Sequence, residues 1–242
     1  MCITVVVIFT TVPDPVCHSE MDVSDTDLFS LEDYNAWIQL DPFDHPKPEP
    51  TRSLYLSDGD FDGHRWITTS IFLTIFQASP NVESLTLVHP DLTPSSELRL
   101  RSLEHAQRNL TSLSIEYAKS VDPEALLQLL CTLPKLDNLK LSGIRMGGVL
   151  NPGAIPPVAP EFKGKLTLLN TETDGERSAI AFLNTHLPMA FVEVHLDVDF
   201  TCPRYVQRVN DLFAACKKTV KRVGLFAVPV QVFGPEHIGS FC

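Results

Sequence analysis

The chain has 242 residues, a formal net charge of −11 and 44% hydrophobic residues. A chain of this length buries roughly 70–75% of its unfolded surface, so its fold needs no disulfide or metal. The negative charge argues against a general nucleic-acid-binding protein, which needs a basic face to displace counterions from phosphates. The six cysteines form no C-x-x-C pair. We interpret them as reduced residues of an intracellular protein, cytoplasmic or nuclear.

Residues 1–50 are predicted to be a partly disordered lead-in segment with one short strand and one helix. Residues 3–9 are apolar and β-branched, but they are too few for a membrane span and lack the features of a signal peptide. We therefore predict a buried strand there. A helix is predicted over residues 30–40, where Ser30 and Asp33 resemble a capping box. The many acidic residues of this region suit a solvated linker or a regulatory acidic tail.

From residue 51 onward, apolar residues recur at fixed offsets. The segments NVESLTL (81–87), NLTSLSI (109–115) and KLDNLKL (135–141) match the L-x-x-L-x-L pattern of a leucine-rich repeat, whose last two apolar positions lie on a short strand. The first apolar residue of each strand recurs at intervals of 31, 28, 26, 27, 28 and 29 residues. These positions are Leu54, Leu85, Leu113, Leu139, Leu166, Val194 and Val223. We therefore predict an α/β leucine-rich-repeat-like solenoid of about six to seven irregular β-α units, with a parallel strand face, over residues 51–228.

Helices are predicted between these strands. The spacing of apolar residues favours helices over residues 66–78, 95–108, 176–186 and 204–218. A further helix is predicted to begin at Pro123 with Asp122 as its N-cap. Residues 147–160 are rich in Gly and Pro and are predicted to be an extended connection or a loop. Residues 229–242 are predicted to be a C-terminal cap or tail that covers the open end of the stack.

Two acidic clusters invite a metal-binding interpretation, but each lacks part of a coordination shell. The segment DGDFDG (58–63) matches the first half of an EF-hand loop, yet Thr69 stands where the bidentate Glu belongs. Glu193, His195, Asp197 and Asp199 alternate along one predicted strand and share a face, but residues two apart on a strand do not close a shell alone. We predict an acidic turn and an exposed polar row instead, with no metal and no cofactor.

The sequence contains no recognisable catalytic motif. G-x-S-x-G, H-E-x-x-H, a P-loop and a dinucleotide-binding glycine pattern are all missing, so we predict that the protein is not an enzyme. Lys217, Lys218, Lys221 and Arg222 form a basic cluster at the end of a predicted helix. The helix dipole explains part of it, and phosphate or nucleic-acid contact is the alternative. We expect neither a nucleic acid nor a membrane as partner.

The strand face that points away from the core remains as the candidate binding surface. Along a strand, core-facing residues alternate with residues on the opposite face. Aromatic and mixed-charge side chains on that face suit protein recognition, and an ordinary solvated face is the alternative. The predicted partner-binding residues are Tyr55, Thr86, Glu116, Lys140, Thr167, His195 and Asp197.

The chain also resembles the leucine-rich-repeat-like region of fungal (basidiomycete) F-box proteins. The resemblance is carried by TRSLYLSDGD (51–60), SPNVESLTL (79–87), NLTSLSI (109–115), LPKLDNLKLSG (133–143), PPVAPEFKGKLTL (156–168) and the segment 202–225. It implies the substrate-recognition part of a ubiquitin ligase receptor, in which an F-box binds a Skp1-type adaptor and the repeats hold a protein target. Residues 1–50 show no F-box pattern, so no adaptor-contacting residue is carried over. There are two alternatives to this interpretation. The first is a structural or degenerate remnant without ligand, and the second is an α/β hydrolase-like enzyme.

Overall fold

The computed structural model describes residues 4–8, 25–28, 31–38, 52–58, 66–92, 109–118, 121–147, 164–169, 179–186, 190–198 and 203–227. Within these ranges the chain forms one all-parallel sheet of nine strands with helices, which confirms the predicted α/β class. No helix in the same ranges has both the length and the apolar character needed to cross a membrane.

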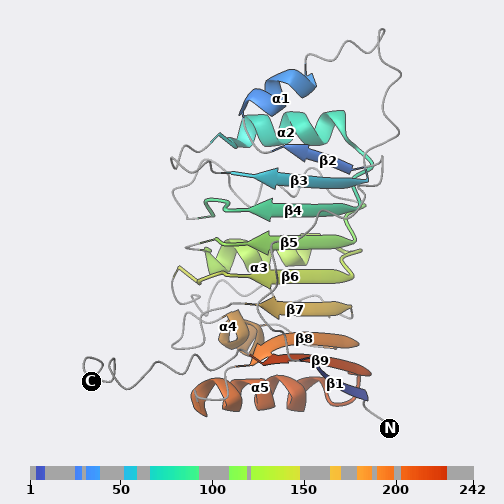
Figure 1. Ribbon diagram of the computed structural model, residues 1–242, viewed down its shortest axis with the longest axis vertical. Helices are drawn as coiled ribbons and strands as arrows, with labels where there is room; N and C mark the ends of the chain where they lie inside the picture. Colours follow the sequence, from blue (N-terminus) through green and yellow to red (C-terminus); the bar gives the residue numbers. More distant parts are fainter. Residues whose placement is uncertain are drawn as a thin grey trace, which may run out of the picture.

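The strands follow one another across the sheet almost in sequence order (Figure 1). They are β1 (Thr4–Ile8), β2 (Asp25–Leu28), β3 (Ser53–Ser57), β4 (Ser84–Val88), β5 (Ser112–Glu116), β6 (Asn138–Ser142), β7 (Lys165–Leu169), β8 (Glu193–Val198) and β9 (Arg222–Ala227). The helices are α1 (Leu31–Ile38), α2 (Thr69–Ala78), α3 (Pro123–Thr132), α4 (Ala179–His186) and α5 (Pro203–Cys216). From β2 to β9 each strand lies beside its predecessor, and β1 pairs with the far side of β9.

The leucine row predicted from the sequence is confirmed as a row of cross-strand partners. Leu54 pairs with Leu85, which pairs with Leu113, and the pairing continues through Leu139, Leu166 and Val194 to Val223. None of these side chains is more than 7% exposed. A second buried row lies two residues further along each strand, from Leu56 to Leu196. The period of two in each strand therefore sends these aliphatic side chains into one continuous core.

The upstream apolar position closes this core at the amino ends of five strands. Val82, Leu110 and Leu136 precede β4, β5 and β6 by the same spacing and are buried. Phe191 and Val220 hold this position before β8 and β9 and are also buried. Each therefore extends the core beyond the strand itself, as the L-x-x-L-x-L pattern requires.

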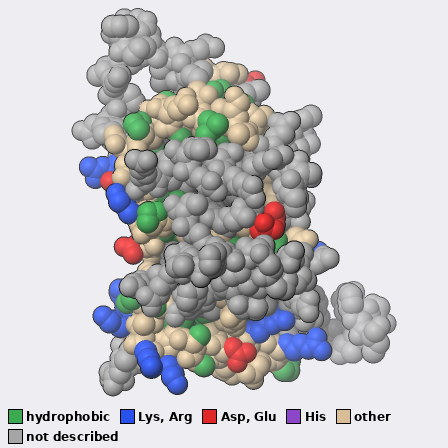
Figure 2. Space-filling model, turned by 180° about the vertical axis from the view of Figure 1, so that it is seen from behind, with side chains coloured by type: hydrophobic (Ala, Val, Ile, Leu, Met, Phe, Trp, Pro, Cys, Tyr) green, Lys and Arg blue, Asp and Glu red, His purple; other side chains and the backbone are tan. Residues whose placement is uncertain are grey.

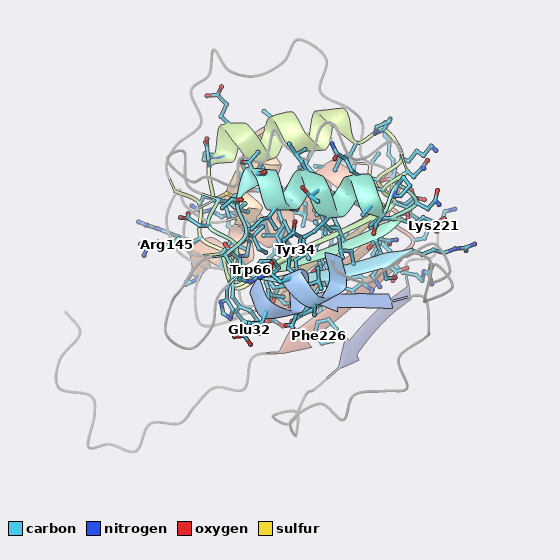
Figure 3. All side chains as sticks on the ribbon, turned by 90° about the horizontal axis from the view of Figure 1, so that it is seen from above. Glu32, Tyr34, Trp66, Arg145, Lys221 and Phe226 are labelled. Atoms are coloured by element: carbon cyan, nitrogen blue, oxygen red, sulfur yellow. The ribbon has the colours of Figure 1, made fainter. Side chains whose placement is uncertain are left out.

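Helices α2 and α3 lie on the same side of the sheet, while Phe226 lies on the opposite side (Figure 3). Helix α3 begins at Pro123 as predicted, and the Asp122 side chain accepts a hydrogen bond from Glu124 N at 3.1 Å. Helix α5 buries Tyr205, Val209, Leu212 and Cys216, which recur at helical spacing and turn one stripe toward the core.

The predicted helix over 66–78 begins three residues later than expected. Trp66 and Ile67 lie before the helix and are buried, and their backbone N–H groups donate to Asp58 Oδ1 at 3.0 and 2.9 Å. The Trp66 indole also donates to Ser57 O at 2.7 Å. The helix then starts at Thr69, with the Thr68 side chain accepting from Ile71 N. Three hydrogen bonds between residues eight or nine apart thus hold this segment outside the helix.

The N-terminal region supplies both outermost strands of the sheet. The predicted strand over 3–9 is β1, and the predicted helix over 30–40 is α1. Strand β2, with the sequence DTDL, was not predicted; it pairs in parallel with β3. The predicted helix over 95–108, residues 148–160 of the Gly- and Pro-rich connection, and the C-terminal cap over 229–242 lie outside the described residues.

Candidate functional site

The predicted partner-binding residues lie on the sheet face opposite the leucine rows. Five of them occupy a single cross-strand row, which also contains Ser114 and Gly224. In order from β3 to β9 this row reads Tyr55, Thr86, Ser114, Lys140, Thr167, His195 and Gly224. Glu116 and Asp197 lie two residues further along β5 and β8, nearer the carboxyl ends. We call this surface the strand face.

The strand face changes in chemistry from one end of the sheet to the other. At the amino ends of β3, β4 and β5 stand Ser53, Ser84 and Ser112, which pair in register. The same row continues on β6 to β9 with Asn138, Lys165, Glu193 and Arg222. All seven predicted residues are partly exposed. The face therefore joins a half rich in small hydroxyl side chains to a half rich in ionic side chains.

Glu193 is the centre of the ionic half. Its Oε1 lies 2.7 Å from His195 Nε2 and 3.3 Å from Lys165 Nζ, and its Oε2 lies 2.8 Å from Arg222 Nη2. The Glu193 side chain is only 14% exposed. Burial would raise its pKa, but the hydrogen bonds from His195 and Lys165 and the charges of Lys165 and Arg222 outweigh burial and lower it. The carboxylate therefore stays ionised and fixes three neighbouring cationic or polar groups.

Glu116 fixes a second, smaller cluster on β5 and β6. Its Oε1 accepts a hydrogen bond from Ser114 Oγ at 2.8 Å and lies 2.8 Å from Lys140 Nζ. The Glu116 side chain is 18% exposed, whereas that of Lys140 is 41% exposed. The carboxylate thus holds the lysine across the strand face while the ammonium group remains accessible to solvent.

The His195 ring has its position because its strand neighbour has no side chain. A Cβ added to Gly224 would stand 2.8 Å from His195 Nδ1, so the ring rests on the glycine backbone. The ring of Phe226 lies beside it, with centroids 6.0 Å apart. Glycine at this point of β9 therefore makes room for the histidine that contacts Glu193.

The carboxyl ends of β4, β5 and β6 carry a feature that sequence reasoning missed. The residue directly after each strand has a positive φ: 52° at His89, 57° at Tyr117 and 60° at Gly143. The only sequence signal is the glycine in the third of these equivalent places. The backbone turn buries the next residue of each repeat, namely Pro90, Ala118 and Ile144. Tyr117 itself is 46% exposed.

The two acidic clusters have structural explanations. Asp58 is buried and accepts the hydrogen bonds from Trp66 N and Ile67 N, while the rest of DGDFDG lies outside the described residues. Glu193 and His195 bond to each other as described above. Across the residues that the structure describes, no group of three or more His, Cys, Asp or Glu side chains is placed to hold a metal ion.

The predicted basic cluster is accessible. Lys217, Lys218, Lys221 and Arg222 are all exposed, just after α5 and at the start of β9. Figure 3 shows Lys221 pointing away from the molecule, and Figure 2 shows Lys and Arg side chains at the end of the molecule that α5 and β9 form. Arg222 is tied to Glu193, so one of the four also belongs to the strand face.

Comparisons of the chain with protein-family models, with curated proteins and with solved structures gave no match.

Proposed function

We propose that the chain is a leucine-rich-repeat-like solenoid that binds a protein partner through its strand face. On this proposal it acts inside the cell, in the cytoplasm or the nucleus, as the substrate-recognition part of an F-box-type ubiquitin ligase receptor does. The observation that carries the proposal is the alignment of Tyr55, Thr86, Lys140, Thr167 and His195 in one cross-strand row. Together with Ser114 and Gly224 they form one continuous row across seven adjacent strands, β3 to β9, which a single partner could contact.

The ordered ionic contacts of the strand face support recognition of a partner. Glu193 and Glu116 are mostly buried and hold Lys165, Arg222 and Lys140 in fixed places. Side chains that are already ordered lose less conformational entropy when a partner docks on them. Charges held in a defined pattern also favour one partner over others, because a wrong partner brings like charges together. The hydroxyl-rich half offers small donors and acceptors over which a partner backbone can approach closely.

The enzyme alternative has less support from the same contacts. Catalysis by a serine or cysteine nucleophile needs a general base within hydrogen-bond reach of it. The Ser114 hydroxyl donates to Glu116, a carboxylate that already contacts Lys140, and His195 Nε2 faces Glu193 instead of a hydroxyl or thiol. Among the residues described on this face, the histidine and the serine belong to separate clusters.

The proposal is tested by affinity purification of the tagged chain from its own cells with quantitative mass spectrometry. Glu116→Lys reverses one charge on the strand face and places a cation beside Lys140. Glu32→Lys makes the same charge reversal on the exposed surface of α1 and serves as the matched control. We expect a specific partner to be lost with Glu116→Lys, Tyr55→Ala and His195→Ala and to be retained with Glu32→Lys.

Photo-crosslinking locates the contact. A benzophenone side chain introduced at Thr86 on the strand face should crosslink to that partner, and one introduced at the exposed Gln77 of α2 should not. Equal recovery of the partner with every variant, together with crosslinks from Gln77 only, would refute the strand face as the binding surface. Recovery of a Skp1-type adaptor would support the receptor role.

A further inference from the structure

Two aromatic residues at the carboxyl ends of neighbouring strands adopt a backbone conformation that favours glycine. His89 follows β4 and Tyr117 follows β5, and their φ values of 52° and 57° lie in the left-handed region. Residues other than glycine are uncommon there, because Cβ crowds the backbone. Gly143, in the same place after β6, shows the residue that the turn itself favours. The strained aromatic residues therefore call for an explanation beyond the turn.

The two rings form a small stacked surface, which we call the aromatic ledge. The centroids of His89 and Tyr117 are 5.3 Å apart and their planes differ by 27°. A Cβ added to Gly143 would lie 2.6 Å from Tyr117 Cδ1, so the tyrosine ring covers the glycine. At 46% exposure, Tyr117 is the one large hydrophobic side chain that is exposed among the described residues. His89 is exposed as well, so the ledge presents aromatic surface to solvent.

Backbone hydrogen bonds hold the ledge in place. His89 N donates to Glu116 O at 2.9 Å, and Tyr117 N donates to Ser142 O at 2.7 Å. Just beyond the ledge, Arg145 N donates to the carbonyl oxygen of Ala118, the residue after Tyr117, at 3.1 Å. These bonds continue the ladder of the sheet past the ends of the strands. A partner side chain would therefore meet a preformed surface and would not have to order a loop.

The carboxylate that precedes the ledge has one oxygen to offer a cation. Glu116, which directly precedes Tyr117, uses Oε1 for both Ser114 and Lys140, and within the described ranges no hydrogen bond or ion pair involves its Oε2. On the β6 side of the ledge the exposed Arg145 points outward (Figure 3). A cation is therefore expected to approach the ledge from the side away from Arg145. The net charge of −11 adds a long-range attraction.

We infer that the aromatic ledge and Glu116 together receive an arginine side chain carried by an extended segment of a protein partner. A guanidinium group is planar and stacks on aromatic faces, while its N–H groups donate to a carboxylate in the same plane. Tyrosine and arginine are also frequent at the energetic centres of interfaces. This inference rests on the proposed function, because the ledge adjoins the strand face at the carboxyl ends of β4 and β5.

The test uses three dye-labelled peptides of one sequence, built from Gly, Ser and Arg, in which the arginines are kept or replaced by lysine or by citrulline. Citrulline keeps the planar shape and loses the charge. Fluorescence anisotropy should give saturable binding of the arginine peptide, at least about fivefold weaker binding of the lysine peptide, and no saturation with citrulline. Resonances of Tyr117 and Gly143 should shift in the NMR spectrum of the arginine complex.

The variants separate binding from folding. Tyr117→Gly removes the ring and relieves the strained φ, so the arginine peptide should bind at least about fivefold more weakly while the melting temperature stays the same or rises. Tyr117→Phe keeps the ring and should bind as wild type. Glu116→Gln should weaken the arginine peptide about as much as Tyr117→Gly.

Two results would overturn the inference: equal binding of the arginine and citrulline peptides, or unchanged binding by Tyr117→Gly. If the cellular partner still crosslinks from Thr86 while either of these results is obtained, the ledge fails and the proposed function stands. If no partner depends on the strand face at all, the proposed function fails first, whatever the peptides do.

Discussion

Replacing Leu113 with alanine probes the arrangement on which the whole sheet depends. Leu113 is 0% exposed and lies between its cross-strand partners Leu85 and Leu139, which are 0% and 1% exposed. Leucine to alanine removes three carbon atoms, and their transfer from water contributes about 2–3 kcal/mol. The cavity left between two rigid neighbours adds about 1–2 kcal/mol, because strands paired on both sides cannot collapse into it. We expect a total loss of about 3–5 kcal/mol.

Urea unfolding at neutral pH, followed by circular dichroism, measures this loss. In a separate thermal unfolding experiment the melting temperature should fall by about 6–20 °C. Leu169→Ala is the matched control, because Leu169 ends β7 on the strand face and is partly exposed. The control should lose about 1 kcal/mol or less. If Leu113→Ala costs no more than Leu169→Ala, the leucine rows do not form the core and the reasoning about both faces of the sheet is wrong.

Three further outcomes follow from individual contacts. Glu193→Gln should destabilise the protein by about 1 kcal/mol at neutral pH. Because the folded-state pKa of Glu193 is lowered, the stability difference from wild type should persist above the ordinary pKa of 4.5 and vanish as pH falls through the folded pKa. A series of unfolding measurements that shows the same difference at every pH would contradict this expectation. Cys216 is buried and burial raises its thiol pKa, so iodoacetamide should modify it only in denaturant, as read by peptide mass spectrometry; rapid labelling of the native protein would show that α5 does not pack as described. Gly164→Ala would place a Cβ 1.7 Å from Asp137 O, so it should cost more than about 3 kcal/mol in the same urea assay, and a neutral result would mean that β7 does not approach residue 137 this closely.

The placement of the strand face was accessible from the sequence, but its contacts were not. Alternation along β8 places Glu193, His195 and Asp197 on one face whatever the neighbours are. The bonds from Glu193 to Lys165 and Arg222 come from β7 and β9, so they depend on which strands lie beside β8 and in which register. The positive φ values of His89 and Tyr117 were equally hidden, because no glycine marks those turns.

By itself the sequence determined the row from Leu54 to Val223 and the start of α3. Strand period and helix capping act within a few residues, so their signals are local and readable. Only the tertiary structure decided that Thr4–Ile8 pairs with β9, that Asp25–Leu28 forms a strand beside β3, and that Trp66 and Ile67 stay outside α2, bonded to Asp58. Each of these depends on hydrogen bonds to residues brought close by the fold, and such partners supply energy that local propensity does not contain.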